Sequence, residues 1–304
     1  MELFRNINYD FIGQKKKAFV LSGFILLLGI IFFFVHGGFN FNIDFTGGTM
    51  MEVAFGKEVD IGAVRNVVEK LKLGSPEIQT IGNSGKSIMI RFQTLEDDKK
   101  DLSLIIFKTL KDNFADKGYE IELLRSDKVG PKIGSELRSK AIWAIIFSLL
   151  AILVYVWFRF QLRFGVAALV ALIHDVLITL AVFTIFDREI GLTVVAALLT
   201  IIGYSINDTI VISDRIRENM KVLFRKRFSE LVNTSLNQVF SRTIITSVAV
   251  FIVVLSIFLF GGTVIKDFSL ALLVGVVFGT YSSIFIVSPI VVYWEKRFPK
   301  KVLK

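Results

Sequence analysis

The sequence predicts a polytopic α-helical membrane protein with six transmembrane helices and one extracytoplasmic α+β domain. Three observations predict this fold class. The 304 residues are 53% hydrophobic with a mean hydropathy of +0.63, whereas soluble domains rarely exceed about half apolar residues. The apolar residues lie in six long runs, each close to the ~20 residues that a helix needs to cross a bilayer. The excess of basic residues lies beside those runs.

The net charge of +9 is unevenly distributed along the chain. Between positions 37 and 139, 15 Lys and Arg stand against 16 Asp and Glu, so this region is close to neutral. With both termini assigned to the cytoplasm, the inner segments hold 17 basic residues, and the two short outer loops hold only Arg188 and Lys266. This is the positive-inside distribution of a membrane protein and not the footprint of a nucleic-acid-binding surface. The absence of cysteine excludes disulfides, thiolate metal sites and cysteine nucleophiles.

The first apolar run, 18–36, follows three lysines, as the apolar part of a signal sequence would. No small-residue cleavage site comes after it, so we expect a retained anchor. The other runs cover 140–158, 164–186, 191–212, 243–261 and 268–293. The predicted organisation is therefore a cytoplasmic N-terminus (1–17), a first transmembrane helix (18–36), an extracytoplasmic domain (37–139), a five-helix transmembrane bundle (140–293) and a basic cytoplasmic tail (294–304).

The outer segment reads as alternating short strands and amphipathic helices. Strands are predicted at 49–55, 77–82, 87–92 and 118–126, and helices at 59–73 and 95–114, the second with an acidic first turn that suits the helix dipole. This βαββαβ order resembles a ferredoxin-like split βαβ domain. The segment holds no Ser/His/Asp set, and GNSGKS lacks the spacing of a phosphate-binding loop. We expect a folded interaction domain, joined to the first helix by a tight glycine loop at Asp44 to Gly48.

Asp208 interrupts the fourth run, about 17 residues from its start, within GYSINDTIVISDRIREN. A charged Asp at the centre of a spanning helix costs roughly 2.5–3.5 kcal/mol. The alternative is that the run ends early and Asp208 is interfacial, although Thr209–Ile212 continue the apolar pattern and DRIREN supplies a better boundary. A set of polar residues falls near one helical face, which predicts contact with protein or water instead of lipid: Thr193, Thr200, Tyr204, Asn207, Asp208 and Arg215.

Two further ionisable sites each allow two interpretations. Arg242 opens the fifth run and is either a cytoplasmic flank that snorkels or an ion-pair partner for a nearby carboxylate, because Arg stays charged at any physiological pH. His174–Asp175 interrupts the third run at about mid-depth. Adjacent helical residues project about 100° apart and need not share a face. The pair is either a buried packing pair or a second element of a proton path.

Five motifs occur in a fixed order along the chain: NIDFTGGT (42–49), VGPKIGSELR (129–138), ALIHDVLITL (171–180), LTVVAALLTIIGYSINDTIVISDRIREN (192–219) and SRTIITS (241–247). A single GG or HD would mean little, but the ordered set is specific and covers essentially the whole chain. It resembles the SecF family, whose members are subunits of the SecDF accessory complex of the bacterial Sec protein-export machinery.

The resemblance implies an architecture and a function. The chain would be a six-helix half of a resistance-nodulation-division (RND) superfamily transporter in the bacterial cytoplasmic (inner) membrane. It would pair with SecD as the second half, act with the SecYEG channel on unfolded polypeptide in contact with lipid, and bind no nucleic acid and no cofactor. It would be no enzyme, but a protein-transport subunit driven by an ion gradient.

The resemblance also assigns residues. Asp208 corresponds to the proton-coupling carboxylate and Arg242 to its basic partner, with Asn207 beside them, while His174 and Asp175 form a possible relay. A carboxylate site does not by itself distinguish H⁺ from Na⁺ as the coupling ion. Two other functions stay open from the residues alone: half of a proton-coupled exporter of small molecules, and a non-transporting scaffold of the export channel.

Overall fold

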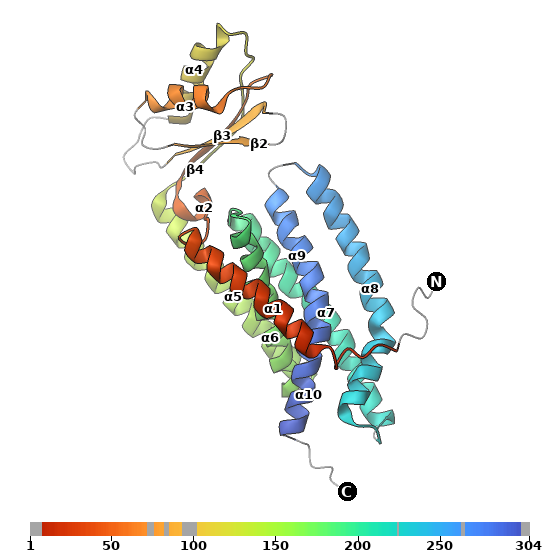
Figure 1. The fold of residues 1–304 in the computed structure, drawn as a ribbon. Coiled ribbons are helices and arrows are strands. Elements are labelled where there is room, and N and C mark those ends of the chain that lie inside the picture. The colour runs from red at the N-terminus through yellow and green to blue at the C-terminus, as the bar shows by residue number, and fades with distance from the viewer. Residues whose placement is uncertain are drawn as a thin grey trace. The chain divides into compact units, whose positions relative to one another are not determined.

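The computed structural model describes residues 8–71, 76–81, 85–92, 102–223, 225–262 and 265–298 (Figure 1). The chain divides into two compact units, one formed by 1–40 with 143–304 and the other by 41–142. Some predicted features fall outside the described residues: most of the GNSG turn, the acidic start of the second outer helix and the last six residues of the basic tail.

Six helices are long and apolar enough to cross a membrane, as the apolar runs predict. Three of them form the centre of the bundle, because about half or more of the apolar window of each is buried: α6, α7 and the span made by α9 and α10. The windows of α1, α5 and α8 are only 11–17% buried within this chain. Their bounds are α1 Lys15–Val35, α5 Pro131–Arg159, α6 Leu162–Ile185, α7 Leu192–Val222, α8 Phe228–Phe260, α9 Lys266–Ser282 and α10 Ser288–Arg297.

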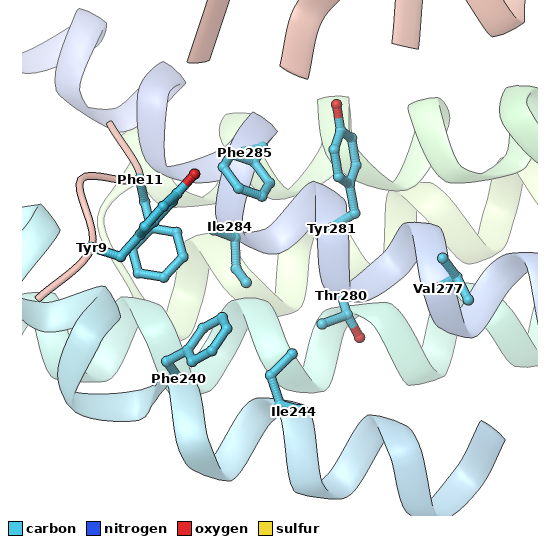
Figure 2. A pocket seen from close by; sticks show the side chains of 9 residues that line it. All are labelled: Tyr9, Phe11, Phe240, Ile244, Val277, Thr280, Tyr281, Ile284 and Phe285. Atoms are coloured by element: carbon cyan, nitrogen blue, oxygen red, sulfur yellow. The ribbon is translucent and has the colours of Figure 1, made fainter. Parts of the chain in front are cut away.

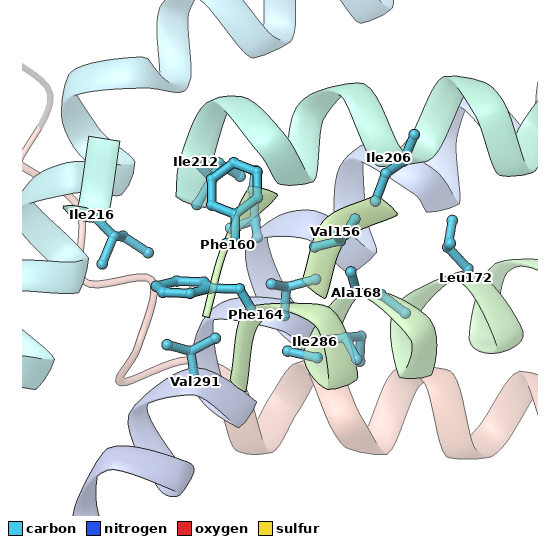
Figure 3. Packing of buried hydrophobic residues seen from close by; sticks show 14 of the residues in the cluster. Val156, Phe160, Phe164, Ala168, Leu172, Ile206, Ile212, Ile216, Ile286 and Val291 are labelled. Atoms are coloured by element: carbon cyan, nitrogen blue, oxygen red, sulfur yellow. The ribbon is translucent and has the colours of Figure 1, made fainter. Parts of the chain in front are cut away.

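One continuous apolar core lies in the half of the bundle where α6 begins and α10 ends. Figure 3 shows Phe164 of α6 between Val291 of α10 and Phe160, which directly follows the last residue of α5. Phe164 has no exposed surface. Small residues allow close helix contacts elsewhere, as is usual between membrane helices. Gly29 of α1 lies against Ala181 of α6, and a methyl group at 29 would come within 2.4 Å of the Ala181 Cβ.

The sixth span is continuous but changes its winding once. A π-helical turn, η1 at Ser283–Val287, joins α9 to α10. Pro289 follows in the first turn of α10 and cannot donate a main-chain hydrogen bond to the turn before it. A π turn is one way in which a helix accommodates such a gap. The Ser288 hydroxyl donates to the main-chain oxygen of Ser283, 3.3 Å away, across this wider turn.

The outer unit has the βαββαβ order that the sequence predicts. Its antiparallel sheet runs β2-β3-β1-β4, so the first strand is central and pairs with the third and fourth. Two helices pack their apolar side chains against the sheet, with Val53, Ile90 and Ile106 fully buried in the common core. The bounds are α2 Ile43–Thr46, β1 Gly48–Ala54, α3 Ile61–Glu69, β2 Glu77–Ile81, β3 Ser87–Phe92, α4 Leu102–Ala115 and β4 Glu122–Val129.

The glycine loop that precedes β1 packs against the start of α5. Gly47 has a φ of +73°, which strains residues that carry a Cβ, and a Cβ there would lie 2.7 Å from the Pro131 Cα. A Cβ on Gly134 would in turn lie 2.9 Å from the Gly47 nitrogen. The motifs FTGGT and VGPKIG are therefore two sides of one tight main-chain contact.

Candidate proton-coupling site in the helix bundle

Asp208 lies inside the bundle, among α7, α8 and α9. Only 3% of its surface is exposed. Its Oδ2 accepts hydrogen bonds from Ser247 of α8, at 3.4 Å, and from Thr280 of α9, at 3.3 Å. Each helix thus contributes one residue to the group. The carboxylate is held by neutral hydroxyl groups alone among the hydrogen bonds and ion pairs of the described residues.

The hydroxyl groups around Asp208 also bind one another. Ser247 and Thr280 lie 2.6 Å apart, oxygen to oxygen, and Tyr204 of α7 donates to Ser247 at 3.2 Å. One hydroxyl proton cannot satisfy two acceptors fully at once, so these bonds compete. The network therefore has alternative arrangements that differ in how many protons point toward Asp208.

Arg242 does not form a direct ion pair with Asp208 within the described chain, in contrast to the predicted pairing. Arg242 is exposed on α8, while Asp208 points inward. Its charge is near enough to interact electrostatically with the carboxylate. On α8, Arg242 shares an exposed face with Thr246 one turn later. A direct pair would need movement of α8 or of the Arg242 side chain.

Asn207 and Asp208 lie on different faces of α7, which corrects the prediction of one polar stripe. Adjacent helical residues are about 100° apart, and here that angle separates the interior from the surface. Asp208 and the partly buried Tyr204 face the bundle, whereas Asn207 and Thr200 are exposed. The outward faces of α7 and α8 therefore both carry polar side chains at membrane depth.

His174 and Asp175 form a second buried cluster, and they contact each other despite being adjacent in the helix. His174 Nδ1 lies 3.1 Å from Asp175 Oδ1. Asp175 has no exposed surface, and its Oδ2 accepts from Ser205 of α7 at 2.6 Å and from Ser282 of α9 at 2.9 Å. The cluster thus joins α6 to α7, the helix that carries Asp208, and to α9, which also contributes Thr280 to Asp208.

The two carboxylate clusters meet the same α7–α9 contact at different positions. Ser205 and Asp208 are about one turn apart on α7, and their α9 partners, Ser282 and Thr280, are two residues apart. A further hydroxyl pair, Thr209 with Ser283 at 2.8 Å, lies in this contact. Movement of α9 along α7 would change the hydrogen bonds of both carboxylates.

An apolar pocket of about 480 Å³ borders both clusters. Figure 2 shows its wall, with Thr280 and Tyr281 side by side on α9 and with Tyr9 and Phe11 from the N-terminal segment. The hydroxyl groups of Thr280 and Tyr281 point away from each other, one toward Asp208 and one toward α1. The N-terminal segment is held against α8 by Asn233, which accepts from the Phe11 main-chain nitrogen at 2.8 Å.

Sequence reasoning missed the hydroxyl residues that hold the carboxylates. Ser247 appears there only as the last residue of the motif SRTIITS, and Thr280, Ser205 and Ser282 do not appear among the predicted site residues. The segment GTYSSIFIVSP holds several hydroxyl residues within one apolar span. This density of hydroxyl residues is the sequence signal that could have identified them.

Residues 109–297 match the family described as protein export membrane protein SecD/SecF, C-terminal, and residues 32–59 match the SecD/SecF GG motif. The chain is similar to the protein translocase subunit SecF of Endomicrobium trichonymphae, with 40% identity over 99% of this chain and 96% of the relative. It is also similar to the SecF of Rhodothermus marinus, with 42% identity over 98% of this chain and 96% of the relative.

The fold is similar to that of solved SecDF structures. The crystal structure of SecDF from Thermus thermophilus, described as a translocon-associated membrane protein, matches with a TM-score of 0.84 at 38% identity. A structure of SecDF in a super-membrane-facing form matches with a TM-score of 0.69 at 37% identity. The matches cover 96% and 97% of this chain but only 39% and 40% of the SecDF chains.

Proposed function

The chain belongs to the SecF family of protein-export membrane proteins, and from this premise we propose that it is the smaller half of an ion-driven export machine. It is a multi-pass membrane protein with an accessory role in Sec-dependent export. The finer proposal is that it pairs with SecD, acts at the SecYEG channel on unfolded polypeptide, and uses the proton gradient of the cytoplasmic membrane. Both termini would be cytoplasmic and the 37–139 domain extracytoplasmic.

The observation that carries this proposal is the environment of Asp208. A carboxylate at membrane depth with only neutral hydroxyl partners is costly when ionised. Protonation removes that charge and changes which hydroxyl groups can donate to it. The two protonation states therefore favour different packings of α7, α8 and α9, and an ion gradient can drive the protein between them. A membrane potential of 100 mV contributes roughly 2.3 kcal/mol per charge moved, a bias of about 50-fold.

The outward polar face of α7 and α8 supports a second membrane half as the partner. Asn207 and Arg242 are exposed at positions where a solitary bundle would meet lipid. Polar and charged side chains in a membrane generally face protein or water. Similarity to less than half of each SecDF chain leaves room for such a half beside this one. We propose that SecD covers this face and brings Arg242 into the proton-coupling group with Asp208.

The proposal is tested by Asp208→Asn, which keeps the shape but removes the titrating group. The chain is reconstituted with SecD and SecYEG in vesicles, and export is measured with an imposed proton gradient, with a sodium gradient and with neither. We expect Asp208→Asn to abolish the gradient-dependent part of export while the complex stays assembled. Stimulation by only one of the two gradients in the unmodified chain identifies the coupling ion.

The matched control is Asp214→Asn on the same helix, because Asp214 pairs with Arg159 and Arg217 in an exposed region. We expect this variant to respond to the gradient normally. Arg242→Ala should lose the gradient response, and Arg242→Lys should keep part of it, since Lys retains the charge without the planar fork. If Asp208→Asn exports as well as the unmodified chain under a gradient, the coupling role is wrong and a scaffold function is favoured. Gradient-dependent drug efflux would favour the small-molecule exporter.

A further inference from the structure

A row of buried and half-buried side chains, linked by hydrogen bonds, joins His174 to the first and last membrane spans. His174 Nε2 lies 2.9 Å from the Ser22 hydroxyl oxygen of α1, which lies 3.1 Å from the Tyr281 hydroxyl oxygen of α9. The Tyr281 hydroxyl donates to the main-chain oxygen of Ala18, back on α1, at 2.6 Å. These hydrogen bonds therefore connect α6 to α1, α1 to α9, and α9 back to α1. Ser22 is only 4% exposed.

Counting protons shows that this row of hydrogen bonds depends on a proton at Nε2 of His174. Three contacts separate His174 Nε2 from the Ala18 oxygen, and each needs one proton between its two heavy atoms. Ser22 and Tyr281 supply one hydroxyl proton each. The third proton must come from Nε2 of His174. When Nε2 carries no proton, the Ser22 hydroxyl must rotate to donate to it. Two hydroxyl protons are then left for three contacts, and one contact has none.

On the opposite side of His174, the contact between Nδ1 and Asp175 Oδ1 needs one proton, carried either by Nδ1 or by a protonated Asp175. The two hydroxyl groups that donate to Asp175 Oδ2 favour the ionised carboxylate, and therefore a proton on Nδ1. Asp175 Oδ2 already accepts from Ser205 and Ser282, and Oδ1 faces His174 Nδ1 at 3.1 Å. A carboxylate with three polar neighbours is fully satisfied when all three donate to it. His174 protonated on both nitrogens satisfies both sides at once. The pair is then an imidazolium beside a carboxylate, without net charge.

Few charged or titratable groups face this pair from the surrounding described helices. On α6 the partner is Asp175, and on α9 it is Tyr281. On α7 the nearest titratable residues along the helix are Tyr204, which donates to Ser247 of α8, and Asp208, whose hydrogen bonds lead to α8 and α9. The lysines of α1, Lys15–Lys17, belong to its first turn. Asp175 is therefore the charge in direct contact with His174.

We infer that His174 is a second proton-carrying group, held as an imidazolium by Asp175, Ser22 and Tyr281, and that its deprotonation loosens α1 from α9. Ser22 and Tyr281 are positioning residues in this inference, because they act through His174. Loss of the Nε2 proton removes one of the contacts in which Ser22 and Tyr281 join α1 to α9. Along the chain α1 leads directly into the outer unit, which begins at Phe41. This step rests on the proposed ion-driven function, in which it couples the bundle to the outer unit.

The protonation of His174 can be read directly, because the chain has only two histidines. The full chain is labelled with [¹⁵N]histidine, purified through a tag without histidine and embedded in lipid nanodiscs. His36→Gln leaves His174 as the single labelled ring. We expect the ¹⁵N spectrum at neutral pH to show two proton-bearing ring nitrogens. A bare ring nitrogen in the unmodified chain would overturn the inference.

Removing the positioning hydroxyls should change this spectrum. In Ser22→Ala and in Tyr281→Phe, we expect a bare Nε2 to appear while Nδ1 keeps its proton. Ser22→Thr, which restores a hydroxyl, should recover the two proton-bearing nitrogens. Ser256→Ala is the matched control, because among the described residues the Ser256 hydroxyl donates within its own helix, to the Ile252 main-chain oxygen. An unchanged His174 spectrum in Ser22→Ala would refute the positioning role.

Export in the reconstituted vesicles then tests the coupling. We expect the gradient-dependent export of Ser22→Ala to be about fivefold lower than that of the unmodified chain, which is the effect of losing one buried hydrogen bond. Ser256→Ala should export at the unmodified rate. Normal gradient-dependent export by Ser22→Ala, with an altered His174 spectrum, would refute coupling through α1. The two proposals fail separately: an inactive Asp208→Asn with a neutral His174 ring overturns only this inference. An active Asp208→Asn with an imidazolium at His174 overturns only the role of Asp208.

Discussion

Replacing Gly29 with alanine should separate α1 from α6 and disturb a hydrogen bond two turns away. The added Cβ would lie 2.4 Å from the Cβ and 2.9 Å from the Cα of Ala181, whereas ordinary van der Waals contact begins at 3.4 Å. The helices must therefore part by about 1 Å, because the obstructing Cα belongs to the main chain. Ser22 precedes Gly29 by seven residues and lies near the same face of α1. A 1 Å shift along the Ser22–His174 contact lengthens it from 2.9 Å beyond hydrogen-bonding distance.

Overpacking of this kind typically costs about 1–3 kcal/mol, and the lost hydrogen bond adds about 1 kcal/mol. We expect Gly29→Ala to lower the free energy of unfolding by about 3 kcal/mol, measured by denaturant titration in mixed micelles. Gly23→Ala on the same helix is the control, since a Cβ there meets nothing within 4 Å. Adding Ala181→Gly to Gly29→Ala should recover part of the loss. Equal stability of the Gly29→Ala and Gly23→Ala variants would refute the close α1–α6 contact.

Two other predictions concern the end of the bundle where α6 begins and α10 ends. Arg163 is 4% exposed, pairs with Glu295 and stacks on Phe164 and Phe228. Because Arg163→Ala leaves the Glu295 carboxylate unpaired, it should lower the free energy of unfolding by about 3 kcal/mol in the same titration. A loss below 1 kcal/mol would contradict a buried pair. Asn233 makes three hydrogen bonds to the main chain of the N-terminal segment, two to nitrogens and one to the Tyr9 oxygen. Asn233→Leu should therefore speed chymotrypsin cleavage beside Tyr9 and Phe11 by at least tenfold, whereas Asn113→Ala, which breaks a bond within one helix, should not change the rate.

The sequence predicted the helices and strands well because their signals are long or strictly periodic. An apolar run of about 20 residues needs no tertiary information to be recognised as a span. The strand at Ser87–Phe92 alternates buried and half-buried side chains along its whole length, and its bounds match the prediction. The last strand begins later than predicted, at Glu122, because apolar residues before it pack on the core without joining the sheet.

The candidate site was only partly predictable. Asp208 stands out because a carboxylate interrupts an apolar run, but its hydroxyl partners do not. A serine or threonine in a membrane helix can bond to its own main chain, as Ser256 does, or to a carboxylate on another helix, as Ser247 does. Both have apolar neighbours in sequence, so only the packing of α8 against α7 distinguishes them. The separation of Asn207 from Asp208 likewise depends on how α7 is rotated.

Because of the π-helical turn at Ser283–Val287, the side chains before and after it follow two different helical phases. A π turn takes up about one residue more than an α-helical turn, so every residue after Val287 is rotated by about 100° from where an unbroken helix would put it. The buried Val291 and the Arg163 partner Glu295 follow the second phase, while Thr280 and Ser282 follow the first. One span can thus direct the side chains before the π turn toward the two buried carboxylates, and those after it toward Arg163 and the apolar core. The extra residue of the π turn sets a fixed rotation between the side chains of α9 and those of α10.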